Sequence, residues 1–150
     1  MPSPHIENWF KETLTALLPE APFMDTIGKL TNPKNLPAVW STLELPPGGT
    51  QKLSIGSPYF DRQYGSAMFV VLVKSGAGTS ELGDYLQKLY DLLPGVSDAQ
   101  ILEPNTGILG HFMLSNIGPP TTEPFEDGNW LAGSISCVYT YDSIRGPAAA

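Results

Sequence analysis

The sequence contains very little of what builds a catalytic or metal site. Cysteine occurs once, at Cys137, and histidine twice, at His5 and His111. A lone cysteine cannot form an internal disulfide, and neither histidine has a cysteine or carboxylate at metal-ligand spacing. No nucleophile sits with a plausible base, and no Gly-Lys-Ser/Thr phosphate loop is present. We therefore expect no catalytic residue, no metal and no cofactor, and we expect Cys137 to be a small buried hydrophobic residue.

Charge is also scarce, and most of it is negative. Charged residues make up 15% of the chain, and the 8 basic residues are scattered singly, which leaves a net charge of −7. Without a basic run, sequence-independent binding to nucleic-acid phosphates is disfavoured. An acidic protein can still surround DNA, because a surface that repels phosphate lets DNA pass without sticking.

Long hydrophobic runs are missing as well. No apolar stretch approaches the ~20 residues that a membrane span requires, and the N-terminal residues lack the basic and apolar regions of a signal peptide. We therefore expect no membrane segment and a cytoplasmic site of synthesis. The 150 residues, 41% of them hydrophobic, favour one domain over residues 1–150 with a real core. The 15 glycines and 15 prolines predict many turns. They also fit extended loops at 19–38 and 118–129, and the tail at 143–150 looks flexible.

Two segments show the spacing of amphipathic helices. The first begins at Ser3-Pro4, which suits a capping residue and a first helical position, and Pro19 ends it near Leu18. The second spans Ser80–Leu93, with acidic residues in its first turn. Trp9 has two interpretations: an exposed aromatic anchor for a partner, or a side chain that packs on a sheet. Its place in the apolar periodicity favours packing.

Several segments carry strand patterns. Val39–Leu45 alternates with period two, and Lys52–Ile55 alternates again after a Gly-Gly turn, which predicts an antiparallel hairpin. The nearly continuous apolar run Ala67–Val73 predicts a central strand buried on both faces. The Gly-rich turn that follows does not have GxGxxG spacing, so we interpret it as a tight connection to the second helix. The remaining strands are a short one at Ile101–Leu102, an edge strand within Ile108–Ile117 and a long one at Trp130–Tyr141, whose odd-numbered residues share one face and whose even-numbered residues share the other.

Two loops hold the candidate contact residues. Gly56–Gly65 contains Tyr59, Phe60 and Tyr64 around the neighbours Asp61 and Arg62. It fits a partner-binding tip with aromatic anchors, or equally a wide hairpin turn whose aromatics cap the core. A ligand site, or stacking of nucleic-acid bases on these aromatics, is less well supported. The second loop is the Pro-rich segment 118–128, which should be exposed and carries Phe125 as a further interface candidate.

The order and spacing of these elements resemble the tail terminator, or minor tail, proteins of long-tailed bacteriophages. The resemblance covers roughly residues 39–93 and 130–142. It rests on the Leu43-Glu44-Leu45 to Gly56 hairpin, the Arg62 to Gly65 loop and the 67–73 strand running into Gly76-Ala77-Gly78-Thr79. The Leu82–Leu93 helix and the Tyr139-Thr140-Tyr141-Asp142 strand complete it. Family members often carry a second basic residue near Arg62, where this chain has Gln63 and Tyr64.

The resemblance implies a small α+β fold, with a mixed or antiparallel β-sheet and two α-helices packed on one face. It also implies a non-enzymatic virion protein, assembled in the host cytoplasm, that forms a hexameric ring on the end of the tail tube. Such a ring stops tube polymerisation, meets a head-completion or connector protein, and lets DNA pass through its lumen. Ring contacts need two different complementary surfaces on each subunit. Alternatives are another neck component, such as a connector or tail-completion protein, and a small ligand-binding domain.

Overall fold

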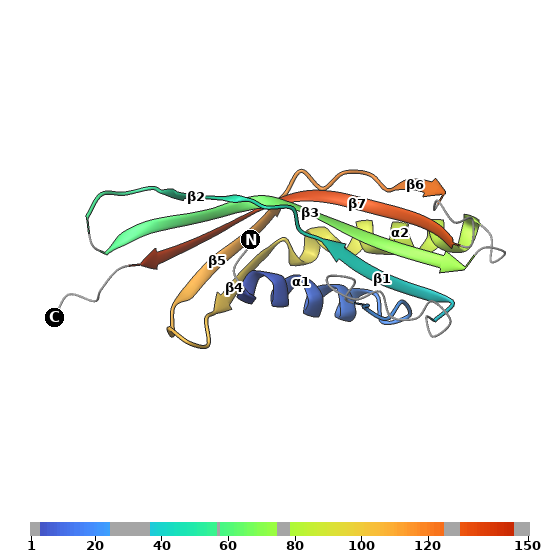
Figure 1. Ribbon diagram of the computed structural model, residues 1–150, viewed down its shortest axis with the longest axis horizontal. Coiled ribbons are helices and arrows are strands. Elements are labelled where there is room, and N and C mark those ends of the chain that lie inside the picture. The colour runs from blue at the N-terminus through green and yellow to red at the C-terminus, as the bar shows by residue number, and fades with distance from the viewer. Residues whose placement is uncertain (1–3, 25–36, 57, 75–78, 125–129, 146–150) are drawn as a thin grey trace.

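The computed structural model describes residues 4–24, 37–56, 58–74, 79–124 and 130–145. They form an α+β fold with a strongly elongated antiparallel sheet (Figure 1). The helices are α1 (Pro4–Leu17) and α2 (Thr79–Leu92), and a short 3₁₀ turn, η2 (Leu93–Val96), follows α2. Both predicted helices are confirmed to within a few residues, because each has an apolar face that repeats at helical spacing.

The sheet has seven strands, and its main path runs β1-β3-β7-β5-β4. Short strands β2 and β6 pair with β3 and β7 respectively. All ladders are antiparallel. The strands are β1 (Val39–Glu44), β2 (Gly49–Lys52), β3 (Tyr59–Lys74), β4 (Asp98–Leu102), β5 (Leu109–Ser115), β6 (Thr121–Pro124) and β7 (Trp130–Arg145).

The predicted hairpin between residues 39–45 and 52–55 is wrong. The second strand spans Gly49–Lys52, and β1 and β2 both pair with β3 rather than with each other. The reason is the length of β3, whose 16 residues accommodate β1 at one end and β2 at the other. The predicted Gly56–Gly65 loop is wrong for the same reason, since β3 begins at Tyr59, pairs with β7 from that residue, and is paired on both edges at residues 61–64.

Three further expectations need correction. β5 lies between β7 and β4, so it is not an edge strand; β4 is the outer one. The 118–129 loop contains β6, which pairs with β7. The tail assigned to 143–150 begins with residues 143–145 of β7, which pair with β3. In the 19–38 loop, Phe23 forms an isolated bridge with Ser41.

The main core lies between the helices and the odd-numbered residues of β3 and β7. Phe10, Phe69 and Phe112 are fully buried there, and α1 and α2 both contribute to this one cluster. The predicted alternation of β7 is confirmed, since Gly133, Cys137 and Tyr141 and the residues between them at period two are buried. A second, smaller cluster of Trp40, Leu72 and Trp130 lies apart from the main one.

One end of the sheet extends beyond the packed helices. Figure 1 shows β2 and the adjoining halves of β3 and β7 projecting away from α1 and α2. We call this region the arm: β2, residues 53–56 that follow it, residues 59–65 of β3 and residues 142–145 of β7. We call the remaining described part, which contains α1, α2 and the main core, the body. The same two long strands, β3 and β7, therefore contribute to both the body and the arm.

Candidate functional site

The candidate contact residues of the expected Gly56–Gly65 loop lie in the arm, where they form part of strand β3 and pair with β7. Because side chains alternate along β3, Phe60, Arg62 and Tyr64 share the face turned away from the main core, and Tyr59 and Asp61 share the other. Asp61 and Arg62 therefore do not converge. That geometry removes the main support for a ligand site built from this pair and Tyr64.

Arg62 is held by a partner that the sequence did not indicate. Its guanidinium donates two hydrogen bonds to the Asp142 carboxylate on β7, with Nε to Oδ1 at 2.7 Å and Nη2 to Oδ2 at 2.8 Å. The hydrogen bonds and charge of Asp142 raise the pKa of Arg62. The Arg62 side chain is thus held by a two-bond contact between β3 and β7, and its charge is balanced by Asp142.

Exposed apolar side chains form a row across the outer face of the sheet, from the arm onto β5 and β4. Phe60 is the register partner of Ile144 on β7, and Leu109 is the partner of Leu102 on β4. Leu109 and Ile144 each lie two residues from the paired His111 and Asp142, so they share that face. Their exposed fractions are 50% for Phe60, 54% for Ile144, 56% for Leu109 and 65% for Leu102. We call these four residues the apolar row.

Tyr64 and Tyr59 differ in their surroundings. Tyr64 is 46% exposed and adds to the outer face. Tyr59 is half-buried, and the Lys52 ammonium lies 4.3 Å from its ring centroid. That contact is a cation–π interaction within the arm.

Trp9 packs into the protein and also lines a cleft. Its ring centroid is 4.2 Å from that of Phe112 and 5.3 Å from that of Phe10, so the packing interpretation is confirmed. The cleft has a volume of ≈630 Å³ and lies between α1 and the segment from β4 to the β4–β5 turn. Its walls are Pro4, His5, Asn8, Trp9, Glu12 and residues 100–106. The remaining candidate, Phe125, lies outside the described residues.

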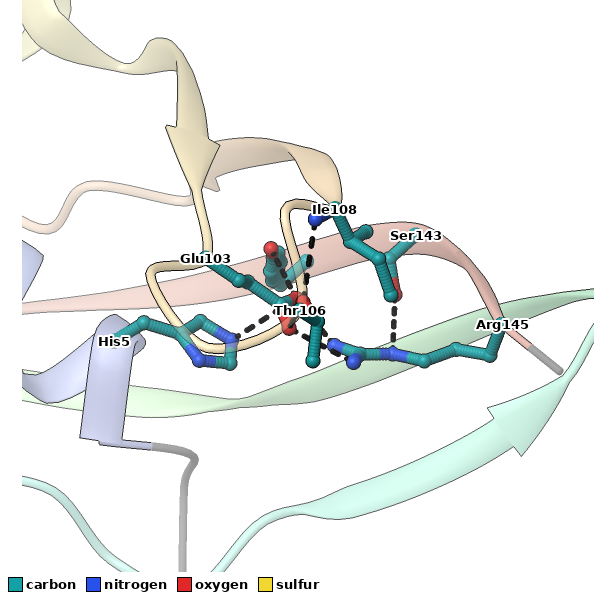
Figure 2. Close-up of polar contacts among 7 residues, drawn as sticks. His5, Glu103, Thr106, Ile108, Ser143 and Arg145 are labelled. Carbon is teal, nitrogen blue, oxygen red and sulfur yellow. Dashed lines mark hydrogen bonds and ion pairs between the residues drawn. The ribbon is translucent and has the colours of Figure 1, made fainter. Parts of the chain in front are cut away.

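Three residues that line this cleft, His5, Glu103 and Thr106, belong to a buried ionic cluster (Figure 2). Glu103, 4% exposed, accepts hydrogen bonds from Tyr141 Oη at 2.7 Å, Arg145 Nη1 at 2.8 Å and Thr106 Oγ1 at 3.1 Å. Arg145 Nη2 also donates to the same carboxylate. The Nε2 atom of His5 lies 3.5 Å from Glu103 Oε2. The cluster ties α1, the β4–β5 turn and the end of β7 together.

The protonation of this cluster follows from its surroundings. Burial would raise the pKa of Glu103, but hydrogen bonds from Tyr141 and Arg145 outweigh it and hold that pKa below its ordinary value. Burial lowers the pKa of His5, opposing the attraction of Glu103, and Arg145 lowers it further. Burial and the bond to Glu103 raise the pKa of Tyr141. The Glu103 carboxylate is therefore charged and already fully engaged with donors.

The Tyr141 ring packs directly against the backbone of Gly110 on β5. A Cβ on Gly110 would fall 2.1 Å from the Tyr141 ring, so glycine is required at this point of β5. Sequence patterns missed the cluster, because Glu103 and Arg145 are 42 residues apart and neither lies in a motif. The other histidine, His111, is also paired with a carboxylate, at 2.5 Å from Asp98 across β4 and β5.

Burial also sets the protonation state of the Cys137 thiol. It is a free, buried thiol in the described part of the chain, and burial raises its pKa to about 12. Among the described residues, no group of three or more potential ligand side chains could hold a metal ion. No helix of the described ranges is long and apolar enough to cross a membrane.

Comparison with known proteins identifies a fold and no family. No family model matches the chain, and no curated protein matches it. Fifteen chains of solved structures match. One of them, a protein whose name carries no functional description, is 16% identical with a TM-score of 0.52, and the match covers 99% of each chain. At this identity the similarity supports the fold alone.

Proposed function

We propose that this chain is a structural virion protein that caps a phage tail tube as an oligomeric ring. The ring, a hexamer, ends tube polymerisation and forms the tail side of the junction with a head-completion or connector protein. DNA passes through its lumen without sequence-specific contacts, which suits a chain of net charge −7. The protein has no enzymatic role in this account and resides in the tail or neck of the virion.

The observation that carries this proposal is the apolar row, which runs from the arm onto β5 and β4. Four large apolar side chains, each at least half exposed, lie in line across four strands. A contiguous exposed apolar patch on a folded protein is typical of a surface that contacts other proteins. Charges next to it are paired within the chain, as in Arg62–Asp142 and His111–Asp98, so the patch can be covered without stranding an unpaired charge.

The body of the protein suits a rigid ring segment. We place both helices on the same face of the sheet, an arrangement supported by the single core cluster that they share and by the view in Figure 1. This leaves the arm and the opposite sheet face free to meet neighbouring subunits and the tube. Another neck position, such as a connector or tail-completion protein, would use the same kind of surface with different neighbours.

Tube growth tests the function directly. Purified tail-tube protein is allowed to polymerise with and without this chain, and tube lengths are measured by electron microscopy. We expect shorter tubes that carry a ring of density at one end. The Phe60→Asp variant, which places a charge in the apolar row, serves as the control and should leave tube length unchanged. Tubes of unaltered length with wild-type protein would overturn the tail-terminator assignment.

A further inference from the structure

Strand β4 has one edge that the described part of the chain leaves without a partner. It ends the main path of the sheet and pairs only with β5 there. Two backbone hydrogen bonds continue this ladder beyond its ends, from Leu114 N–H to the Ser97 carbonyl and from Glu103 N–H to the Ile108 carbonyl, both at 2.8 Å. Hydrogen-bonded pairs alternate along an antiparallel ladder, so the odd-numbered residues of β4 are the ones that bond to β5.

The even-numbered residues of β4 therefore present their backbone outward. The N–H and C=O groups of Asp98, Gln100 and Leu102 point away from β5, and all three residues are exposed. No described residue pairs with this edge. β4 also lacks the proline and lysine that commonly protect an edge strand. Such a regular row of donors and acceptors is matched by the backbone of another extended chain.

The cleft beside α1 borders this edge. Its walls include Gln100 and Leu102 of β4 and, on the helix, Asn8, Trp9 and Glu12. Glu12 follows Asn8 by four residues and Trp9 by three, so the three share one side of α1. Side chains alternate along a strand, so a strand paired with β4 would turn every second side chain into the cleft and the others to the outer face. The cleft volume of ≈630 Å³ has room for the inward side chains.

The surroundings select the side chains of such a strand. On the outer face, Leu102 is 65% exposed and ends the apolar row, so an apolar neighbour would extend that row. In the cleft, Glu12 is exposed, whereas Glu103 is paired with Arg145. The lining contains no lysine or arginine. A basic side chain is therefore favoured on the inner side.

The other strand edges of this chain match the site poorly. β2 has the sequence Gly-Thr-Gln-Lys and offers no apolar side chain to lie beside Leu102. β6 contains a proline and a glutamate, and β1 is already bridged at Ser41 by Phe23. A second β4, paired antiparallel about a two-fold axis, would bring two Glu12 side chains into one groove. A different protein therefore fits the edge better than a second copy.

We infer that the free edge of β4 binds an extended segment of a partner protein, which adds to the sheet as a further strand. The segment runs along the five residues of β4, with apolar side chains on the outer face and a basic side chain in the cleft. Main-chain hydrogen bonds supply the affinity, and the alternation of side chains supplies the specificity. The inference goes beyond the proposed function, because this pairing requires no ring.

A defined peptide tests the pairing. The probe is a fluorescein-labelled heptapeptide of alternating valine and lysine, and its binding is measured by fluorescence anisotropy. Gln100→Pro removes one outward N–H and leaves the bonds to β5 in place, whereas Gln100→Ala keeps that N–H. Both variants have the wild-type net charge, so any unspecific attraction of the lysines is unchanged. We expect Gln100→Pro to weaken binding about tenfold and Gln100→Ala to leave it unaltered.

Hydrogen exchange and a charge reversal test the same contact without a proline. In the wild type, the peptide should slow amide exchange at Gln100 and Leu102 at least about tenfold, while Ala99 and Ile101, which already bond to β5, should change little. Glu12→Lys, on the exposed side of α1, should weaken binding of the valine–lysine peptide. The same variant should strengthen binding of a peptide with glutamate in place of lysine.

The contrary outcomes are distinct. Equal affinities of Gln100→Pro and Gln100→Ala would overturn the inference, as would absence of binding or binding that leaves Gln100 and Leu102 unprotected. Protection of these two amides that rises with protein concentration, without peptide, would assign the edge to a second copy instead. None of these results concerns tube length, so the proposed function would stand.

Discussion

The body and the arm are built from the same two strands, and they differ in what covers them. In the body, Phe69 and Val71 of β3 are fully buried beneath helix side chains. In the arm, the same face of β3 carries Tyr59, Asp61 and Gln63, which are only partly buried because no helix extends that far. The backbone is equally well paired in both regions. Strand pairing therefore sets the shape of the molecule, while the helices decide how far along β3 the inner face is buried in the core.

A core substitution should show the largest effect on the body. Phe10 is fully buried and contacts Phe69, Phe112 and Tyr139. Replacing it with alanine removes a large side chain from a closed site, so Phe10→Ala should lower the free energy of unfolding by about 3–5 kcal/mol. Urea denaturation of the monomeric protein measures this. A loss below about 1 kcal/mol would mean that the body is not packed as described.

The junction of body and arm should come next. Glu103→Ala leaves the Arg145 guanidinium and the Tyr141 hydroxyl without their acceptor. We expect a loss of about 3 kcal/mol in the free energy of unfolding, since removing Glu103 strands the Arg145 charge, which is only 21% exposed. Thr106→Ala removes only one neutral donor from the same carboxylate and should cost about 1 kcal/mol. Equal effects of the two variants in urea denaturation would contradict the role given to the ion pair.

The same junction should make stability depend on pH. Folding lowers the pKa of His5 below its ordinary 6.5, so the unfolded state binds more protons as the pH falls through that value. Folding also lowers the pKa of Glu103, whose contribution is present above its ordinary 4.5 and is lost as the pH falls through the folded value. Stability should therefore decline from pH 7 to pH 5, and more steeply below. A His5→Gln variant should flatten the decline between pH 7 and 5 in urea titrations; an unchanged slope would argue against His5.

The arm should show the smallest effect on stability. Phe60→Asp should change the free energy of unfolding by less than about 1 kcal/mol, because the residue is half exposed and contributes little to the core. Assembly should nevertheless be lost, since the apolar row then carries a charge. A large fall in the melting temperature would show that the arm belongs to the stabilising core.

Sequence patterns predicted the parts of the fold that are periodic. Both helices, β1 and β7 follow from apolar residues repeated at the spacing of their element. The outer half of β3 was missed because Asp61-Arg62-Gln63-Tyr64-Gly65 has no apolar alternation and includes a glycine. It is a strand because β2 and β7 pair with both of its edges. Part of that pairing comes from β7, where Asp142 lies 80 residues along the chain from Arg62. No local sequence pattern reveals so distant a partner.

The sequence singled out Phe60 and Tyr64 as contact candidates but did not indicate their geometry. Phe60 and Tyr64 are exposed as a contact surface requires, but as part of a flat strand face rather than a loop tip. The tip itself is formed by Leu53 and Ile55, which alternation assigned to a strand. The Glu103 cluster left no trace in sequence, because its members come from α1, the β4–β5 turn and β7.

The mass of the protein in solution tests the central claim most directly. Light scattering behind a sizing column would be measured for wild type and Phe60→Asp, each with and without tail-tube protein. The account predicts a ring for wild type, formed alone or on tube ends, and a folded monomer for Phe60→Asp under both conditions. A wild-type monomer that ignores tube protein, or a Phe60→Asp variant that assembles normally, would contradict the assignment of the arm as the assembly surface.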